Sequence, residues 1–330
     1  MTGKQRLGER GENDAAQPIP GPVMVIGGAE DKLRDRVILG RFIDLAGPEA
    51  RIVVISTASS LGEEATDLYR ELFTALGAKD VTGLRPLTRH EANDPSNGST
   101  LERATGVFLT GGNQLRLSSV VNGTVLGDAL VEAHLRGAVI AGTSAGASAV
   151  STHMMAFGAS GATPKHRMAQ VSAGLGILDG LVIDQHFEQR TRLGRLLAIV
   201  AQSPSLIGIG LDEDTAAVVY ADRTFEVIGR GAVTVVDGSN VQTDAFYTKA
   251  HRPMMVSGAV LHSLPAGYRF DLTARSLLAP VHDLTPRAQR VPVTERRRLR
   301  TLARRIAAEG ADSFVTERRR RPQRDREASE

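Results

Sequence analysis

A serine between two glycines is the first feature of the chain that could do chemistry. The string Gly142-Thr143-Ser144-Ala145-Gly146 follows an apolar run and precedes a stretch of small residues. In a nucleophile elbow, the serine at a sharp strand-to-helix turn projects its hydroxyl from the sheet, and flanking glycines avoid backbone collisions. The next amide, here the N–H of Ala145, points at the oxyanion that forms during acyl transfer. Gly/Ser/Ala-rich turns are common, so the string alone leaves a purely structural turn open.

A serine nucleophile needs a base, and histidine usually supplies it. Among the eight histidines, His186 differs because it ends an apolar strand, Leu181-Val182-Ile183, and should emerge at the same sheet edge as Ser144. A hydrogen-bonded structural histidine at a strand end is the alternative. The other histidines lie in polar, turn-like or helix-end segments: His90, His134, His153, His166, His251, His262 and His282.

An acidic triplet could supply the group that orients this histidine. The apolar strand predicted over Ile207–Leu211 runs directly into Asp212-Glu213-Asp214. One of the three carboxylates could accept the His186 N–H and fix the tautomer whose other nitrogen faces the serine. Spacing does not choose among them, and a solvated acidic turn is the alternative for each one taken singly.

The elements around these residues predict an α/β fold. Strands that are apolar on both faces alternate with helical patterns up to residue 143, which indicates a parallel sheet covered on two sides. Sites form at the carboxyl edge of such sheets. After about residue 205, short alternating segments predict an antiparallel β extension. Strands are expected over 22–28, 51–57, 81–84, 106–110, 138–143, 181–183, 207–211, 216–220, 224–228 and 232–236, a helix over 63–76, and a polar loop over 90–99.

Composition and charge narrow the function classes. The 330-residue chain has no cysteine, which excludes thiolate nucleophiles, disulfides and cysteine-based zinc sites. From Glu295 onward 12 arginines face seven acidic residues, so the basic pI belongs to the tail. We expect a disordered N-terminal tail (1–20), one catalytic α/β domain (21–290) and an Arg-rich C-terminal helix or tail, partly disordered (291–330). Neither a signal peptide nor a membrane span is evident, so a cytoplasmic location is expected.

Six separated motifs, in order, resemble the cyanophycinases of peptidase family S51, which are related to aspartyl dipeptidase (peptidase E). The resemblance covers roughly residues 22 to 275. The motifs are Gly27-Gly28-Ala29-Glu30-Asp31-Lys32, Leu109-Thr110-Gly111-Gly112-Asn113-Gln114-Leu115, Gly142-Thr143-Ser144-Ala145-Gly146-Ala147, Ser151-Thr152-His153-Met154, Ile183-Asp184-Gln185-His186-Phe187 with Gln189-Arg190, and Gly208-Ile209-Gly210-Leu211-Asp212-Glu213.

The resemblance implies a fold and a set of catalytic roles. The fold would be a three-layer α/β sandwich with a mostly parallel central sheet, like class I glutamine amidotransferases. Ser144 would be the nucleophile, His186 the base and Glu213 the acid. This chain order, with the acid last, differs from that of α/β-hydrolases. The oxyanion hole would use the N–H of Ala145 and an amide of Gly111-Gly112, of which Gly112 is preferred.

The resemblance also implies a substrate. Cyanophycin is a storage polymer with an aspartate backbone and an arginine amide-linked to each side-chain carboxylate, and enzymes of this kind release β-aspartyl-arginine as exopeptidases. Such a substrate calls for binders of carboxylate and guanidinium groups. For Arg192 and Arg195 a surface position at a helix start is the alternative. The predicted substrate-binding residues are Gln114, Asp184, Gln185, Arg190, Arg192 and Arg195.

Two other functions are weighed against this one. An α-aspartyl dipeptidase of the peptidase E type shares the fold and nucleophile, but tends to carry Asn where this chain has Ser148. A non-catalytic protein could bind phosphate or nucleic acid through Gly27-Gly28 or the Arg-rich tail. However, the glycine pair lacks the G-x-G-x-x-G and G-K-[ST] patterns. No metal or cofactor is required, a homodimer is expected, and neither a membrane nor nucleic acid is expected as a partner.

Overall fold

The nucleophile belongs to the parallel half of a nine-stranded sheet. The computed structural model describes residues 19–280, 301, 302 and 305. In this part of the chain, five strands pair in parallel in the order β1-β5-β4-β2-β3, which makes β5 a central strand with neighbours on both sides. Their bounds are Val23–Ile26 (β1), Arg51–Ile55 (β2), Asp80–Leu84 (β3), Gly106–Leu109 (β4) and Val139–Thr143 (β5).

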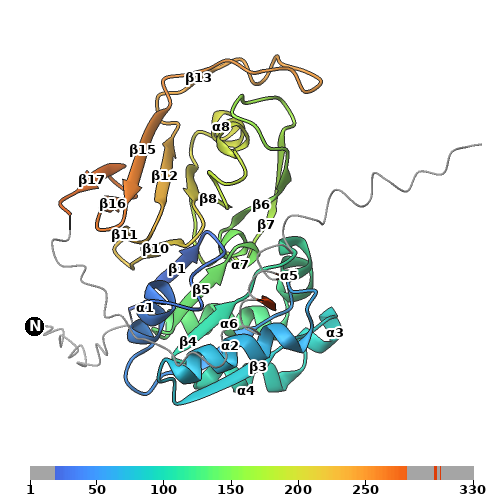
Figure 1. Ribbon diagram of the computed structural model, residues 1–330. Helices are drawn as coiled ribbons and strands as arrows, with labels where there is room; N and C mark the ends of the chain where they lie inside the picture. Colours follow the sequence, from blue (N-terminus) through green and yellow to red (C-terminus); the bar gives the residue numbers. More distant parts are fainter. Residues whose placement is uncertain (1–18, 281–300, 303–304, 306–330) are drawn as a thin grey trace, which may run out of the picture.

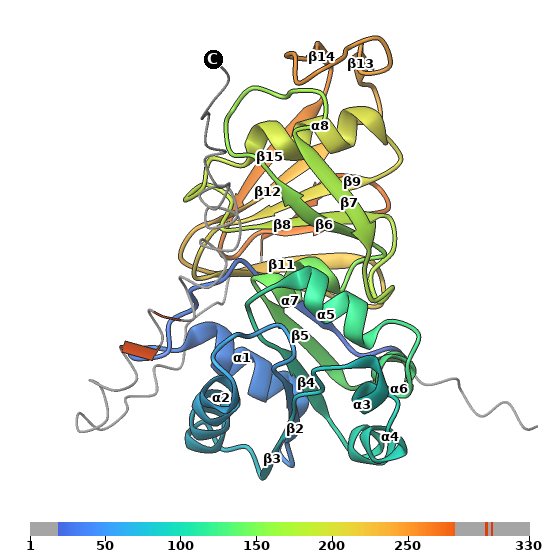
Figure 2. The same cartoon turned by 90° about the vertical axis from the view of Figure 1, so that its right-hand side faces the viewer.

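Helices cover both faces of this parallel half (Figure 2). Side chains that alternate along β1 divide between two cores: Met24 and Ile26 pack with α1 and α2, while Val23 and Val25 face the other side. That alternation is the period of two expected for a strand buried on both faces. The helices are α1 (Val37–Ala46), α2 (Glu63–Ala75), α5 (Gln114–Val121), α6 (Val125–Leu135) and α7 (Ala145–Ala149).

The predicted antiparallel extension is present, but it is divided between two sheets. β10 pairs with the free edge of β1, and the strands that follow it continue the main sheet in the antiparallel sense. The order of the complete sheet is β17-β16-β11-β10-β1-β5-β4-β2-β3. The added strands are β10 (Thr215–Val219), β11 (Thr224–Gly229), β16 (Arg269–Asp271) and β17 (Ser276–Leu278).

A second sheet carries the strands that precede His186 and the acidic triplet (Figure 2). Its order is β15-β12-β9-β8, with β8 and β9 parallel. We expected His186 to emerge at the edge of the sheet that carries Ser144; its strand belongs instead to a separate sheet, and β10 occupies the free edge of β1. The bounds are Leu181–Gln185 (β8), Ile207–Leu211 (β9), Ala232–Asp237 (β12) and Val260–Pro265 (β15).

The two sheets pack against each other and share one core. Ile183 and Ile209 of the second sheet lie in the same buried cluster as Val25 and Ile140 of the main sheet. On its outer face the second sheet is covered by α8 and by a β-ribbon (Figure 2). These elements are α8 (Leu193–Gln202), β6 (His153–Gly158) and β7 (Ala169–Ala173), and a short hairpin beyond them consists of β13 (Gln242–Thr243) and β14 (Val256–Ser257).

The polar loop expected over residues 90–99 instead contains two short helices, α3 (Arg89–Ala92) and α4 (Pro95–Glu102). Their start signals lie in the same polar residues that indicated a loop. The side chain of Thr88 caps α3 by accepting from the N–H of Glu91, and Asp94 caps α4 by accepting from the N–H of Ser96. Pro95 occupies the first turn of α4, where its missing N–H costs nothing.

Three described residues of the C-terminal segment are helical: Thr301, Leu302 and Arg305. Leu302 packs on the core under α1 and α2, and Arg305 forms a 2.9 Å ion pair with Glu64. The rest of the predicted Arg-rich segment and the predicted N-terminal tail up to residue 18 lie outside the described residues, so the domain boundaries stay predictions. No helix of the described part is long and apolar enough to cross a membrane.

Candidate active site

Ser144 occupies a strained turn between β5 and α7. Its backbone has φ 51° and ψ −109°, which L-residues other than glycine rarely adopt. A Cβ on Gly142 would lie 2.5 Å from the backbone of Gly146, and one on Gly146 would lie 2.4 Å from the carbonyl oxygen of Leu109. Both glycines of the pentapeptide are therefore needed for close backbone approach, as the elbow interpretation expects.

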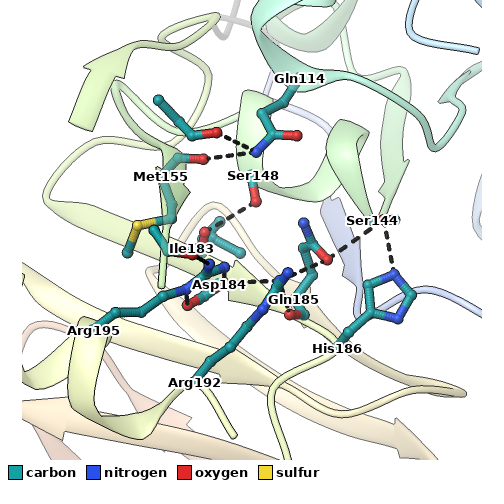
Figure 3. A network of polar contacts seen from close by, with 12 residues as sticks. Gln114, Ser144, Ser148, Met155, Ile183, Asp184, Gln185, His186, Arg192 and Arg195 are labelled. Carbon is teal, nitrogen blue, oxygen red and sulfur yellow. Dashed lines mark hydrogen bonds and ion pairs between the residues drawn. The ribbon is translucent and has the colours of Figure 1, made fainter. Parts of the chain in front are cut away.

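Ser144, His186 and Glu213 form a continuous hydrogen-bonded line (the Ser144–Glu213 line). The Oγ of Ser144 lies 2.9 Å from Nε2 of His186, and Nδ1 of the same ring lies 2.6 Å from Oε1 of Glu213. Figure 3 shows the first of these contacts. The residues come from the two sheets: Ser144 follows β5, whereas the other two follow β8 and β9.

The backbone around the histidine keeps its ring in place. The N–H of His186 donates to the carbonyl of Gly27 at 2.9 Å, and its φ of 46° turns the chain sharply at the end of β8. A Cβ on Gly28 would lie 2.4 Å from Cε1 of the ring. Gly28 thus leaves space for the imidazole.

The structure separates the three acids that spacing left equivalent. Asp212 accepts from two backbone amides, and Asp214 accepts from the N–H of Asp31 at 2.8 Å. Both flanking carboxylates therefore fix loops. Only Glu213, among the three, reaches the ring of His186.

Burial and neighbouring charges set the protonation of this pair. Desolvation lowers the pKa of His186 below its ordinary value, and the positive charges of Arg190 and Arg192 lower it further, whereas Glu213 acts in the opposite direction. The hydrogen bond from His186 is the largest cause that lowers the pKa of Glu213. At neutral pH the imidazole is therefore uncharged and the carboxylate ionised, which are the states a general base and its orienting acid require.

Asp184 and Arg195 lie inside the protein. The carboxylate of Asp184 is fully buried and contacts both Nε (2.6 Å) and Nη2 of Arg195, while Nη1 of Arg195 donates to the carbonyl of Gly158 at 2.9 Å. Figure 3 shows the carboxylate between two guanidinium groups. The sequence placed both residues in the substrate site. In the structure their polar atoms pair with protein groups: with each other, with Arg192 and with the carbonyl of Gly158. Asp184 is the fourth residue of β8, a strand whose residues are all buried.

Arg192 and Gln185 connect this ion cluster to the nucleophile. Nη1 of Arg192 lies 3.2 Å from Oδ1 of Asp184 and 3.0 Å from Oε1 of Gln185. The same Gln185 oxygen is 3.5 Å from Oγ of Ser144. Burial lowers the pKa of Arg192 to about 10, with Asp184 acting in the opposite direction, so the guanidinium stays charged at neutral pH.

The two remaining predicted binding residues lie nearer the surface. Gln114, half-buried at the start of α5, donates from Nε2 to the carbonyls of Met155 and Ala156 at 3.2 and 2.6 Å (Figure 3). Arg190, also half-buried, lies close enough to His186 for its positive charge to lower the pKa of that histidine.

Ala145 and the turn that contains Gly112 lie beside the nucleophile. Ala145 is the first residue of α7, so its N–H has no partner within the helix. A Cβ on Gly111 would lie 3.4 Å from Cβ of Ser144, which places the Gly111-Gly112 turn next to the hydroxyl. Gly112 adopts φ 134°, a conformation that glycine favours.

Sequence reasoning missed a buried acid behind the elbow. Glu30 accepts from Thr143 Oγ1 at 2.7 Å, from the Tyr69 hydroxyl at 2.6 Å and from Lys32 Nζ at 2.8 Å. Burial alone would raise the pKa of Glu30, but Lys32 and these hydrogen bonds outweigh it and hold the pKa low. The signal in the sequence was an acid two residues after the Gly27-Gly28 pair, within a motif to which no role was assigned.

Gln189 was quoted only as part of a motif, yet its Oε1 accepts from the N–H of Glu213 at 2.9 Å. Among the residues from 19 to 280 and the three beyond, no group of three or more His, Asp or Glu side chains could hold a metal ion.

These features define a peptidase family. Residues 23–228 match the model of peptidase family S51, and the chain belongs to that family. It is 40% identical over 267 residues to the cyanophycinase of Trichormus variabilis, covering 80% of this chain and 89% of that protein. It is 38% identical over 262 residues to the cyanophycinase of Geminocystis herdmanii, covering 78% and 96% respectively.

A solved structure supports the fold. The crystal structure of a peptidase from an acI-B1 Actinobacterium matches with a TM-score of 0.60 and 23% identity, covering 78% of this chain and 98% of that one. The predicted α/β class with a mostly parallel central sheet is thereby confirmed.

Proposed function

We propose that the protein is a serine exopeptidase that hydrolyses the backbone of cyanophycin and releases β-aspartyl-arginine. The main support for the proposal is the Ser144–Glu213 line. Oγ of Ser144 lies 2.9 Å from Nε2 of His186, and Nδ1 of His186 lies 2.6 Å from Oε1 of Glu213, which is the arrangement of nucleophile, base and acid that acyl transfer needs. The names of the relatives suggest the substrate.

The proposed reaction has two halves. Nε2 of His186 takes the hydroxyl proton as Oγ of Ser144 attacks the backbone carbonyl, and the N–H groups of Ala145 and Gly112 donate to the resulting oxyanion. The protonated imidazole then gives its proton to the leaving amine, which leaves an ester on Ser144. Water, deprotonated by His186, hydrolyses the ester, and Glu213 holds the ring in one tautomer throughout.

Substrate binding divides into two groups of residues in this proposal. Gln185, Arg192 and Arg190 lie nearest the Ser144–Glu213 line and are our candidates for contact with carboxylate groups of the polymer. Asp184 and Arg195 act instead as positioning residues, since their hydrogen-bonding atoms pair with protein groups. Gln114 spans between α5 and β6 and can present its remaining oxygen to a donor on the substrate.

The test uses purified protein and insoluble cyanophycin, with soluble products followed by mass spectrometry. We expect the wild type to release β-Asp-Arg and Ser144→Ala to release none. Ser119→Ala, an exposed serine on α5, serves as the matched control and should keep full activity. Release by Ser144→Ala at the wild-type rate would contradict the proposed nucleophile.

The alternative function is an α-aspartyl dipeptidase, which could use the same Ser144–Glu213 line. Hydrolysis of Asp-X dipeptides without release from cyanophycin would favour it over our proposal. A homodimeric assembly and a cytoplasmic location stay predictions.

A further inference from the structure

A hairpin far from the Ser144–Glu213 line presents two aromatic side chains to solvent. Within this hairpin (residues 242–257, the aromatic hairpin), Phe246 is 81% exposed and Tyr247 85% exposed. Their neighbour Ala245 is buried in a small cluster together with Met254, Met168 and Ala198 of α8. The backbone is therefore anchored on α8 while two large apolar groups point away. Among the large apolar side chains of the described residues these two are the most exposed, and adjacent exposed aromatic groups are typical of binding surfaces.

The aromatic hairpin is held by defined contacts. The N–H of Tyr247 donates to the carbonyl of Asp244 at 2.9 Å, and the N–H of Met255 donates to Oδ1 of the same residue at 2.7 Å. Two further backbone bonds tie the hairpin to the neighbouring loop (residues 161–168), from His166 to Arg252 and from Met254 to Pro164, both 3.0 Å. Little conformational entropy would be lost when such a surface binds a partner.

This surface is strongly positive, although residues 1–294 taken together are not. Residues 161–168 and 242–257 contain a single carboxylate, Asp244, which already accepts a backbone hydrogen bond. By contrast, residues 1–294 as a whole hold 28 basic and 30 acidic side chains. The exposed cations of the surface are Lys165, Arg167, Lys249 and Arg252.

The surface is connected by hydrogen bonds to the segment that follows His186. The N–H of Gly161 donates to the carbonyl of Thr191 at 2.7 Å, and the N–H of Gly194 donates to the carbonyl of Gly161 at 3.0 Å. The segment from His186 to Arg192 therefore touches the loop that supports the aromatic hairpin. Figure 1 shows this hairpin and loop side by side beyond α8, on the half of the molecule that provides the histidine.

We propose that the aromatic hairpin and the 161–168 loop form a docking surface for the insoluble polymer, separate from the site that cuts it. This inference rests on the proposed function. Each repeating unit of cyanophycin keeps a free α-carboxylate and a guanidinium group, because its arginine is attached through the α-amino group. The four cations pair with the carboxylates, and the faces of Phe246 and Tyr247 receive the guanidinium groups. A second copy of the chain fits poorly, since two such surfaces would bring like charges together.

The experiment measures binding and turnover separately. Catalytically inactive Ser144→Ala protein is sedimented with insoluble cyanophycin, alone and combined with Phe246→Ser/Tyr247→Ser or with Lys249→Gln/Arg252→Gln. Matched controls carry Leu261→Ser/Leu277→Ser or Lys79→Gln/Arg103→Gln, which remove exposed side chains of the same kinds elsewhere. We expect affinity for the polymer to fall at least about tenfold in the variants of the docking surface and to stay unchanged in the matched controls. Active versions should keep the wild-type kcat/KM on a short soluble (β-Asp-Arg) oligomer.

The outcomes distinguish this inference from the proposed function. Equal polymer binding by surface and control variants, while the wild type still cuts both substrates, would overturn the inference alone. Absence of hydrolysis of either substrate by the wild type would overturn both. Surface variants that lose binding to a single-stranded oligonucleotide but not to cyanophycin, or that change only the oligomeric state on sizing columns, would assign the surface to another partner.

Discussion

The two halves of the candidate site are positioned by different physical means. Around Ser144, the main sheet relies on small residues: two glycines permit close backbone approach and a strained φ of 51°. Around His186, the second sheet relies on charge, with Asp184 buried between Arg192 and Arg195 directly before the histidine. The tightly packed backbone around Ser144 has no room for an added side-chain atom. The buried ion cluster before His186 is instead sensitive to the loss of a charge. The comparison therefore predicts opposite sensitivities to mutation in the two halves.

The largest effect is expected where the halves meet. Ser144→Ala and His186→Ala should each lower kcat by about 10⁴-fold or more, because the two side chains act as one unit. The double variant should lose little beyond either single one. Steady-state rates of β-Asp-Arg release measure this. Additive losses would show that the two halves work independently.

Removal of charge should destabilise the second half. Asp184→Asn keeps the shape of the side chain but leaves two buried guanidinium groups without their anion, so the free energy of unfolding should fall by about 3–5 kcal/mol. Denaturant titration measures it, and Asp80→Asn, an exposed carboxylate on β3, is the control that should change little. If Asp184→Asn left the free energy of unfolding nearly unchanged, the buried ion cluster would not be what positions the second half of the site.

An added methyl group should damage the first half. Gly142→Ala places a Cβ 2.5 Å from the backbone of Gly146, and we expect a loss of about 1–3 kcal/mol in unfolding free energy. Gly40→Ala in α1 is the matched control, because no atom lies within 4 Å of its added Cβ and alanine favours a helix. If both variants were equally stable, steric clearance would not explain the elbow.

The smallest effect concerns pH. His186 must be neutral to accept a proton, and its pKa lies below the ordinary histidine value, so kcat/KM should fall only when the pH drops below about 6.5. The positive charge of Arg190 contributes to that lowering. Arg190→Gln should therefore raise the pKa of His186 and move the acid limb to higher pH. Arg103→Gln, which removes an exposed arginine elsewhere, should leave the pH dependence of kcat/KM unchanged. If Arg190→Gln also left the acid limb unchanged, the charge of Arg190 would not contribute to the pKa of His186.

Much of this arrangement could be predicted from local patterns. The strand before Ser144, the turn around it and the strand over 207–211 have the expected places, because apolar runs and glycines act locally. The second sheet could not be predicted, since an apolar strand indicates burial on both faces but not which strand lies beside it. The burial of Asp184 and Arg195 against each other could not be predicted for a related reason. Charged residues near a strand end point to a site, and their mutual pairing depends on side-chain directions that a single sequence does not reveal.

The turn that carries Glu213 has a mechanical consequence. It is one of the short connections between the two sheets, joining β9 of the second sheet to β10 of the main sheet, so a change in the angle between the sheets would move it. We expect the 2.6 Å contact of Glu213 with His186 to change when the two sheets move against each other. The NMR signal of the Nδ1 proton would report, in solution and without substrate, how far thermal motion or a bound partner tilts one sheet against the other.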